Sequence, residues 1–533
     1  MFGLRTMRTA RKYPGQQNNA GLWEENAVPD AVSSLCKNPL TPVLDPYALA
    51  REMSCRHFIN GQLVPARSGR TFDVVNPAKG EVVGQAAFGD AADVDAAVEA
   101  AAKAQKDWAK RPARERGKLV AECGRLLTAH VEELARLIAL ETGKALRTES
   151  RVEAGVLSDS FVFYGGLAPE LKGETVPFSP TIMTITQREP IGVVGAIIPW
   201  NVPLLLMALK IAPALVAGNT VVVKSAEEAP FTVLRVCQIL GQVLPPGVFN
   251  MLSGFGPECG APLVAHPKVG KVTFTGSVET GRIVYKTAAE KLIPVTLELG
   301  GKSPMIVLED ADLDKAVAGA VVGMRFTRQG QSCTASSRIF VHSAIHDEFV
   351  RRLMAKVDAM VMGDPLDEAT DIGAIVSAQQ FEKVKDYITV GALTPGAVAH
   401  ACSQLPTDPA LSKGHFIQPV IFTGLTNESR VAREEIFGPV TCVIRFDDYE
   451  DAIRQANDTE YGLAATIWTN DLKKAMDATQ RLEAGLVQVN QNLVVQPNIS
   501  YGGVKTSGLG KEASLEAMLE HFTHKKTIMI NMA

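Results

Sequence analysis

The chain has 533 residues, with 54 basic and 58 acidic side chains and a formal net charge of −4. A single hydrophobic core stops growing near about 250–300 residues, so this length predicts two or three folding units. The basic side chains form no stripe that could follow a phosphate backbone, which argues against a nucleic-acid partner. No apolar run approaches the ~20 residues that a membrane-spanning helix needs, so we expect no membrane partner.

Residues 1–54 show little periodicity, and we expect a poorly ordered N-terminal extension there. Arg5, Arg8, Arg11 and Lys12 precede any acidic residue, and no long apolar stretch follows them. This pattern excludes a secretory signal. Eight scattered cysteines without a Cys-x-x-Cys pair indicate free thiols in a reducing compartment. We therefore expect a cytoplasmic protein, or a mitochondrial matrix protein if the basic segment is a transit peptide.

The first predicted elements alternate between helix and strand. The folded part begins near Phe58, a helix covers 94–108 with Asp93 as its N-cap, and a second helical pattern covers 119–140. The elements expected next are a strand at 191–198, a helix at 204–216, a strand at 220–224, a helix at 232–244, and strands at 249–252 and 272–274. Near-continuous apolar strands between helices indicate a parallel sheet covered on both faces.

A second alternating region follows Gly300 and Gly301. Its expected elements are a strand at 305–308, a helix at 313–326 capped by Asp310 or Asp312, and strands at 339–342, 440–446, 464–468 and 486–490. Proline and serine at 397–414 predict a loop. Strand-like pieces near 173–190 and 522–532 belong to neither region and are of the kind that pairs with another subunit. The pattern predicts two α/β domains.

One cysteine lies on a polar, glycine-containing loop between a predicted helix and a predicted strand, in Phe326-Thr-Arg-Gln-Gly-Gln-Ser-Cys333. Loops held by rigid elements often carry reactive groups. A thiolate is a strong nucleophile towards carbonyl carbon, and nearby charges or dipoles can lower its pKa. The alternative is a buried structural thiol, because most free cysteines are packing residues.

Two further polar side chains stand at predicted strand ends. Glu298 ends an apolar, β-branched segment, and apolar neighbours should raise its pKa into the range of a general base. Asn201 lies between Pro199 and Pro203 at a strand end, where open α/β sheets place their sites, and its amide can donate to a developing oxyanion. The alternatives are an exposed glutamate and an asparagine in an ordinary proline-flanked turn.

Two glycine patterns are candidates for a phosphate site. Gly254-Phe-Gly256-Pro-Glu-Cys-Gly260 follows a strand, but its spacing does not match the dinucleotide fingerprint G-x-G-x-x-G. Phe274-Thr-Gly276-Ser277 is the better candidate, because it runs from a strand into a helix whose N-terminal N–H groups can meet a pyrophosphate. A plain strand-to-helix turn is the alternative.

Six motifs in one order resemble the aldehyde dehydrogenase superfamily, over roughly residues 57–532. They are Pro199-Trp-Asn-Val-Pro203, Ala217-Gly-Asn-Thr-Val-Val-Val-Lys224, Phe274-Thr-Gly-Ser277, Leu297-Glu-Leu-Gly-Gly-Lys302, Gly330-Gln-Ser-Cys333 and Glu434-Glu-Ile-Phe-Gly-Pro439. Any one could arise by chance, whereas the ordered set is specific. The resemblance implies an α/β fold with a Rossmann-like parallel-sheet cofactor domain, a second α/β catalytic domain and a small β oligomerisation arm.

The resemblance also implies domain boundaries and self-association as a homodimer or homotetramer. The expected parts are an N-terminal extension at 1–54, an NAD-binding domain at 55–172 and 191–298, an oligomerisation arm and tail at 173–190 and 500–533, and a catalytic domain at 299–499.

Carried over residue by residue, the resemblance makes Cys333 the nucleophile, Asn201 the oxyanion donor and Glu298 the general base. An aldehyde would become a carboxylic acid through a thiohemiacetal and a thioester on Cys333, hydrolysed by water that Glu298 activates. The implied cofactor-binding residues are Trp200, Lys224, Glu227, Gly276, Ser277, Glu435 and Phe437. The implied chemistry needs no metal, and we expect none.

Glu227 predicts a preference for NAD over NADP. A carboxylate bonds the ribose 2′-hydroxyl and repels a 2′-phosphate, although Lys224 could partly offset the repulsion, so NADP use stays open. The expected substrate-pocket residues are Val202, Leu205, Leu206, Leu209, Thr327, Ser332 and Thr334.

The substrate we expect is a medium-sized, largely apolar aliphatic or aromatic aldehyde. Val202 stands where relatives often have a larger aromatic residue, which suggests a wider tunnel. Leu209 stands where semialdehyde-binding relatives often have arginine, which argues against a semialdehyde. Thr327 and Arg328 replace residues that are often aromatic or amide, so a polar substrate portion stays open.

Three departures from the family pattern are Ser225 in place of proline, Gln488 in place of tryptophan, and Ser500-Tyr-Gly-Gly-Val-Lys505 in place of the commoner Pro-Phe-Gly-Gly-Tyr-Lys. Other functions are a CoA-acylating or semialdehyde dehydrogenase, a reductase without covalent catalysis, and a non-catalytic binding protein on the same fold. CoA-acylating relatives generally lack the base carboxylate, so Glu298 favours hydrolysis.

Overall fold

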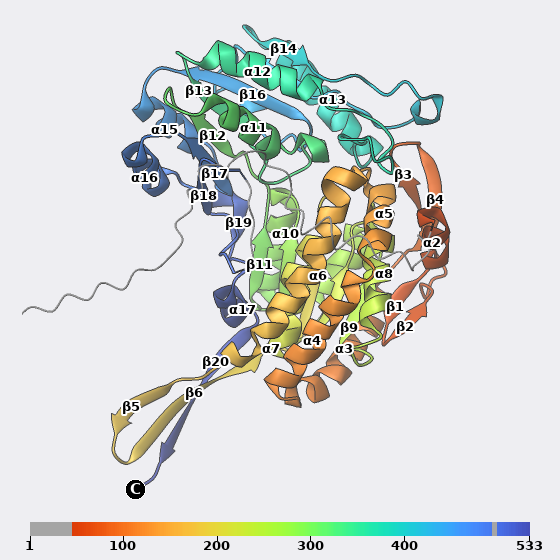
Figure 1. Cartoon of the computed structure of the whole chain (residues 1–533). Helices are drawn as coiled ribbons and strands as arrows, with labels where there is room; N and C mark the ends of the chain where they lie inside the picture. Colours follow the sequence, from red (N-terminus) through yellow and green to blue (C-terminus); the bar gives the residue numbers. More distant parts are fainter. Residues whose placement is uncertain (1–44, 493–497) are drawn as a thin grey trace, which may run out of the picture. The chain divides into compact units, whose positions relative to one another are not determined.

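The computed structural model describes residues 45–492 and 498–533. Its larger sheet has eight strands (Figure 1), in the spatial order β19 (Gly508–Leu509), β11 (Val295–Glu298), β10 (Val269–Thr275), β7 (Val193–Ile197), β8 (Thr220–Lys224), β9 (Phe249–Leu252), β1 (His57–Ile59) and β2 (Gln62–Val64). The central strands from β11 to β9 are parallel, whereas β19 and β1 pair antiparallel at the two sides.

This sheet is apolar on both faces because it is covered on both. Val221 and Val223 of β8 pack into one hydrophobic cluster, and Val222 between them packs into another. Alternate side chains of a strand point to opposite faces, so the two clusters lie on opposite sides of the sheet. The helices of the first cluster include α4 (Ala113–Thr128), α5 (Val131–Thr142), α6 (Arg151–Gly166), α7 (Pro203–Ala217) and α8 (Pro230–Leu240). Those of the second include α3 (Ala91–Lys110) and α10 (Val278–Glu290). The predicted parallel sheet with two covered faces is confirmed.

The strand order reverses between β7 and β10. From β7 the chain adds β8 and then β9 on one side, and afterwards places β10 and β11 on the other side of β7. In open α/β sheets, ligands bind outside the carboxyl ends of the strands at such a reversal. Asn201 follows β7 and Gly276 follows β10, so both lie where this rule places a ligand.

The second sheet has seven strands, in the order β14 (Val398–Ala401), β15 (Val420–Thr423), β16 (Val440–Phe446), β13 (Arg338–His342), β12 (Pro304–Val307), β17 (Ala464–Trp468) and β18 (Leu486–Val489). It is also covered on both faces, since Met305 and Ile306 belong to different clusters. The Met305 cluster includes α11 (Leu313–Met324) and α12 (His346–Asp358). The Ile306 cluster includes α13 (Ala378–Ala392), α15 (Tyr449–Asn457) and α16 (Leu472–Arg481).

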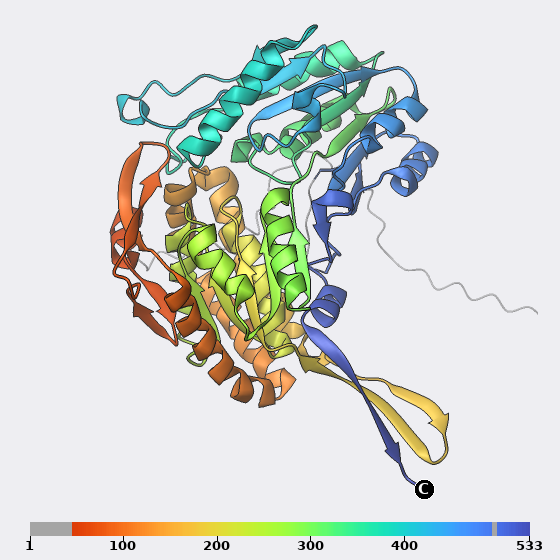
Figure 2. The same cartoon turned by 180° about the vertical axis from the view of Figure 1, so that it is seen from behind.

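Two smaller groups of strands complete the described sheets. β3 (Thr71–Asn76) pairs with β4 (Glu81–Ala87), and β6 (Ile182–Pro190) lies between β5 (Thr175–Ser179) and β20 (Thr523–Asn531). Figures 1 and 2 both show β5, β6 and β20 as a ribbon that extends beyond the neighbouring helices. The strand-like pieces predicted near 173–190 and 522–532 therefore pair with each other in this three-stranded sheet, called the arm below.

Some local predictions were wrong. Asp90, not Asp93, is the N-cap of α3; Asp93 is the N3 residue of a capping box and accepts a hydrogen bond from the Asp90 N–H at 3.2 Å. The single helix predicted at 119–140 is two helices, α4 and α5, separated at Ala129 and His130. Both sides of this break are apolar, so the pattern alone did not show it.

Two segments expected to lack regular structure contain an element. Residues 397–414, predicted as a loop, include β14, which is formed by antiparallel pairing with β15 rather than by an apolar pattern of its own. The expected extension at 1–54 includes α2 (Pro46–Met53), capped by Asp45 and buried through Leu49 and Met53; the rest of that segment lies outside the described residues. Among the described residues, no helix has both the length and the apolar character that a membrane crossing requires.

Candidate active site

The carboxyl ends of the central parallel strands lie at one edge of the first sheet. Lys224 is the last residue of β8 and Glu298 the last of β11. Asn201 follows β7, while Gly276 and Ser277 connect β10 to α10. The Gly276 N–H donates to the Glu298 carbonyl oxygen at 3.1 Å, which joins the ends of the two neighbouring strands. Residues far apart in the sequence thus share one edge.

The Cys333 loop is fixed by its backbone and by amide side chains. Gln329 and Gly330 have φ values of 54° and 64°, in the left-handed region. The Gln329 side chain donates to the Gly143 carbonyl oxygen at 3.0 Å, and the Gln331 side chain accepts from the Val376 N–H at 3.1 Å. All seven described cysteines are free, and only Cys333 and one other are not buried. The loop therefore holds a partly buried cysteine in a defined position.

Asn201 and the segment after Glu298 both contact this loop. The Asn201 side-chain amide donates to the Gln331 carbonyl oxygen at 3.2 Å, two residues before Cys333. Gly301 packs so closely against the Cys333 carbonyl oxygen that a Cβ atom there would overlap it. The structure therefore brings the three predicted catalytic residues, from three different segments, into one region.

Glu298 has the environment expected of a general base. Its side chain is only 3% exposed, and neither carboxylate oxygen has a hydrogen-bond partner within the described ranges. Burial raises its pKa well above the usual range; the Glu512 carboxylate raises it further, and the Lys210 ammonium lowers it. Gly502 has a φ of 145°, and a Cβ there would lie 2.5 Å from Glu298 Oε1, so this position requires glycine.

A buried ion pair close to Glu298 was not predicted from the sequence. Lys210 Nζ lies 2.6 Å from Glu512 Oε1, both side chains are buried, and the Thr273 hydroxyl donates to the same oxygen at 3.0 Å. Lys210 is the only charged residue of the otherwise apolar α7. A single charge in a buried helix needs a partner. The sequence could therefore have indicated that Lys210 is paired, but not that its partner is Glu512.

The Cys333 thiol contacts one hydroxyl group. Tyr501 Oη lies 3.6 Å from Cys333 Sγ. Burial raises the pKa of Cys333 to about 11; the Tyr501 hydrogen bond lowers it, the Glu435 and Glu298 carboxylates raise it, and Arg328 lowers it. From the sequence, Tyr501 was noted only as part of a departure from the family pattern, and its contact with Cys333 was not predicted.

The predicted cofactor residues lie along the same sheet edge. Lys224 Nζ is 3.1 Å from Glu227 Oε2, and Ser277 caps α10 by accepting from the Thr280 N–H at 3.2 Å. Ser225 and Thr275, next to the carboxyl ends of β8 and β10, have buried hydroxyl oxygens without a hydrogen-bond partner in the described part of the chain. Such orphaned hydroxyls beside a helix N-terminus fit a long polar ligand such as a dinucleotide.

The other predicted cofactor residues approach the edge from two segments. The Trp200 and Phe437 rings meet edge to face, with centroids 5.3 Å apart. Phe437 has a φ of 59°, which is uncommon outside glycine. Glu435 Oε1 accepts a hydrogen bond from the Gly301 N–H at 2.9 Å, so this carboxylate stands beside the segment that follows Glu298.

The predicted pocket residues divide into apolar and polar groups. Val202, Leu206 and Leu209 are buried, and Leu205 is partly exposed. Ser332 Oγ and Thr334 Oγ1 lie 3.2 Å apart and bond each other.

The remaining predicted pocket residue, Thr327, is engaged inside the protein. Its hydroxyl bonds the buried Glu149, to which Arg328 Nε also donates, at 2.9 Å. Since Glu149 engages both side chains, neither supports a polar substrate portion.

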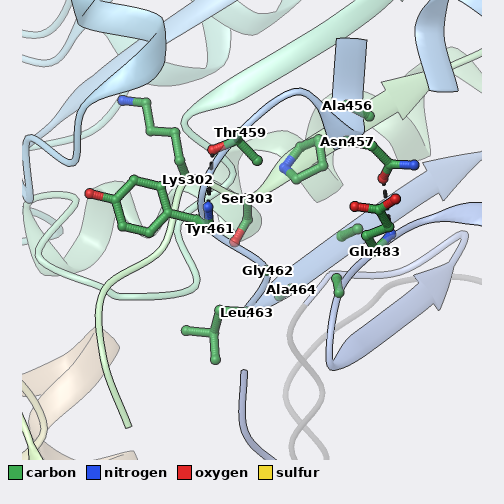
Figure 3. A pocket seen from close by; sticks show the side chains of 13 residues that line it. Lys302, Ser303, Ala456, Asn457, Thr459, Tyr461, Gly462, Leu463, Ala464 and Glu483 are labelled. Atoms are coloured by element: carbon green, nitrogen blue, oxygen red, sulfur yellow. Dashed lines mark hydrogen bonds between the residues drawn. The ribbon is translucent and has the colours of Figure 1, made fainter. Parts of the chain in front are cut away.

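A small pocket and a cluster of charged side chains involve other residues than the predicted site. Figure 3 shows a small pocket lined by Lys302, Ser303, Asn457, Tyr461 and Glu483 among others, but by none of the predicted catalytic residues.

Asp95, Glu99 and His266 have ligand atoms within 4.8 Å of one another, as a metal site would need. However, Lys268 pairs with Glu99. The Lys268 N–H also donates to His266 Nδ1, which leaves the ring proton on Nε2, the nitrogen that faces Asp95. This arrangement is a surface charge network.

Comparisons with known proteins agree with this geometry. The model of the aldehyde dehydrogenase family matches residues 63–528. The mitochondrial benzaldehyde dehydrogenase of Antirrhinum majus is 42% identical over 475 residues, which cover 88% of this chain and 88% of that protein. The phenylacetaldehyde dehydrogenase of Pseudomonas fluorescens is 41% identical over 507 residues, covering 93% and 99%.

Among solved structures, the betaine aldehyde dehydrogenase of Staphylococcus aureus in complex with NAD⁺ has a TM-score of 0.88 at 35% identity, covering 91% of this chain and 97% of that one. The chain belongs to the aldehyde dehydrogenase family. The predicted fold class, with two α/β domains, is confirmed.

Proposed function

We propose that the protein oxidises an aldehyde to a carboxylic acid with NAD, using Cys333 as nucleophile, Asn201 as oxyanion donor and Glu298 as base. The observation that carries this proposal is the approach of three segments. Asn201 bonds the loop of Cys333, and Gly301, three residues after Glu298, packs against the same loop. We infer that the thiol, the amide donor and the carboxylate act on one carbonyl carbon held between these segments.

In the first step, the Cys333 sulfur attacks the aldehyde carbon and the carbonyl oxygen becomes an alkoxide. The Asn201 amide and the Cys333 N–H are the donors for that oxygen; removal of one such donor typically costs about 10²–10³ in rate. When bound, NAD supplies the acceptor for the hydride that leaves the carbon, so the carbon remains attached to Cys333 as a thioester.

In the second step, Glu298 removes a proton from water, and the water oxygen attacks the thioester carbon. The carbon–sulfur bond breaks, the carboxylic acid leaves, and Cys333 regains its thiolate. A base with a raised pKa holds the proton more firmly than an ordinary glutamate does, which favours this transfer. Glu298 also supports hydrolysis over transfer to CoA, and an acyl-CoA product would contradict this assignment.

We propose NAD rather than NADP as the preferred cofactor. Glu227 lies beside Lys224 at the end of β8, with part of its side chain exposed. A carboxylate there bonds the 2′-hydroxyl of a ribose and repels a 2′-phosphate. A related solved structure carries NAD⁺, which agrees with this preference.

The substrate we propose is a medium-sized aliphatic or aromatic aldehyde. Val202, Leu206 and Leu209 are apolar residues close to Asn201 in the sequence. Arg328, which could otherwise bind a charged substrate, is paired with Glu149 inside the protein. Two relatives are named for benzaldehyde and phenylacetaldehyde, both aromatic aldehydes of this size.

We also propose that the arm joins subunits into a homodimer or homotetramer. Phe178 is 71% exposed and Met529 is 61% exposed, and several further apolar residues on β5, β6 and β20 are exposed beside them. Clustered exposed apolar side chains usually mark a protein contact. A reducing compartment, either the cytoplasm or the mitochondrial matrix, would keep the described cysteines free.

The test is NADH formation with a panel of aldehydes, together with mass spectrometry of the intact chain. Cys333→Ala should abolish NADH formation, whereas Cys442→Ala, at a buried cysteine, should leave it near the wild-type level. Glu298→Gln should accumulate the acyl group on Cys333, because the thioester forms but its hydrolysis slows about 10²–10⁴-fold. Unchanged turnover in Cys333→Ala, or an acyl group on another residue, would refute the assignment.

A further inference from the structure

Tyr501 is the hydroxyl-bearing side chain next to the Cys333 sulfur. Its Oη atom lies 3.6 Å from Sγ, within hydrogen-bond range for sulfur, and its side chain is only 8% exposed. The ring belongs to the same hydrophobic cluster as the buried residues of α7. The hydroxyl is therefore turned towards the thiol from an apolar wall that gives it little access to water.

The backbone holds this side chain in place. Tyr501 and Glu512 form an antiparallel bridge with two hydrogen bonds, of 2.9 Å from the Tyr501 N–H and 2.7 Å from the Glu512 N–H. Glu512 is fixed in turn by its buried ion pair with Lys210. Because the Tyr501 backbone is held by this bridge, its hydroxyl needs little reorganisation to stabilise a negative charge on sulfur.

Charged groups with opposing effects on the thiolate lie around the thiol. Glu298 at the end of β11 and Glu435 in the segment before β16 disfavour a thiolate, whereas Arg325 and Arg328 at the end of α11 favour one. Arg328, however, is already bonded to Glu149. A neutral hydroxyl can donate to sulfur without a further ion having to be buried.

The hydroxyl is also a departure from the family pattern, in which phenylalanine is commoner before the two glycines of this segment. Phenylalanine would fill the same apolar site without a donor. The extra oxygen therefore changes the chemistry next to Cys333 while leaving the packing largely the same.

We propose that Tyr501 is a further catalytic residue, whose hydroxyl donates a hydrogen bond to the Cys333 thiolate and stabilises it for attack. The thiol proton leaves to solvent, the hydroxyl keeps its own proton, and no electrons are transferred. When sulfur bonds to the aldehyde carbon it loses its negative charge, and the hydroxyl then faces a neutral thioether. The hydrogen bond therefore weakens as the carbon–sulfur bond forms but persists in part in the transition state, so it raises the thiolate fraction more than it lowers the reactivity of the thiolate.

The inference rests on the proposed function only through the role of Cys333 as nucleophile, so the decisive measurement uses neither aldehyde nor cofactor. The full-length protein is alkylated with iodoacetamide from pH 6 to pH 10, and modification of Cys333 is followed by peptide mass spectrometry. This range lies below the pKa of Cys333, so the displacement between the pH–rate profiles of two variants reports the difference in thiol pKa. Tyr501→Phe should raise the thiol pKa by about one unit and slow alkylation at pH 7 by about threefold, because the thiolate fraction falls tenfold per unit while the more basic thiolate reacts about threefold faster.

Tyr164→Phe is the matched control, since Tyr164 is buried in the same cluster and the structure gives it no contact with Cys333. Its thiol pKa should equal that of the wild type. With aldehyde and NAD, Tyr501→Phe should lower kcat/KM by the same factor for small and large apolar aldehydes.

An unchanged thiol pKa in Tyr501→Phe would overturn the inference, and so would a loss of kcat/KM confined to one aldehyde, which would make Tyr501 a specificity residue. If the wild type oxidised no aldehyde while the alkylation difference persisted, the proposed function would fail and the stabilisation of the thiolate would stand.

Discussion

Lys210→Met should affect both the stability of the chain and the pH dependence of its turnover. The Lys210–Glu512 pair is buried, with side-chain exposures of 0% and 1%. Methionine has a similar volume but no charge, so among the described residues the change leaves the buried Glu512 carboxylate with the Thr273 hydroxyl as its side-chain hydrogen-bond partner. Removal of one partner of a buried pair costs about 3–5 kcal/mol. That is a large fraction of the about 5–15 kcal/mol that stabilises an ordinary domain.

The same change should shift the titration of Glu298. Lys210 lowers the pKa of this carboxyl and Glu512 raises it. Without Lys210 one lowering influence is lost, while burial and Glu512 still raise the pKa and Lys511 still lowers it, so the pKa of Glu298 rises further. A base works only when it is deprotonated, so turnover in Lys210→Met should require a higher pH. Glu512→Gln removes the raising influence of this carboxylate, although burial still raises the pKa of Glu298, and should move the acid limb of turnover to lower pH.

The assay combines thermal unfolding with kcat measured from pH 5 to pH 10 for both single variants and for Lys210→Met with Glu512→Gln. The double variant removes both charges of the ion pair, so it should recover most of the lost stability and have an acid limb between those of the single variants. Two results would contradict the reasoning. One is a double variant that is destabilised by the sum of the single losses; the other is acid limbs that move in the same direction in both single variants.

Two further predictions concern the cofactor and the arm. Glu227→Gln should lower the ratio of kcat/KM for NAD to that for NADP by at least about tenfold, because the amide no longer repels a 2′-phosphate; an unchanged ratio in steady-state kinetics would exclude Glu227 as the selecting residue. Phe178→Asp should shift the protein to smaller assemblies in analytical ultracentrifugation, because it places a charge on the exposed apolar surface of β5. Glu174→Gln, at an exposed polar position near the start of β5, is its control, and equal sedimentation of both variants would contradict the role of the arm.

The sequence predicted the framework of the fold because the core strands are apolar throughout. The strand at 220–224 was predicted with the bounds that β8 has, since β-branched residues fill it between two glycine- or serine-containing segments. Caps and breaks were harder to predict. Asp90 and Asp93 both take part in one capping box, so the pattern pointed to the wrong member, and the break between α4 and α5 interrupts no apolar periodicity.

The candidate site was predictable only where residues stand in a contiguous motif. Cys333, Glu298 and Asn201 are each flanked by glycine or proline, and the structure brings their segments together. Lys210 and Glu512 are 302 positions apart, and Cys333 and Tyr501 are 168 apart. A contact over such separations depends on the folded topology, and neither residue type nor spacing reveals it.

The C-terminal segment connects the residues next to Cys333 and Glu298 with the arm. After Tyr501 and Glu512 the chain passes through one short helix, α17 (Leu515–His521), and enters β20, which is paired with β6 along its whole length. A displacement of the arm is therefore coupled through this short connection to Tyr501 and Glu512. Quaternary contacts on β20 would therefore also restrict the movement of Tyr501 and Glu512, and cutting the chain before Thr523 would remove this restriction together with the interface.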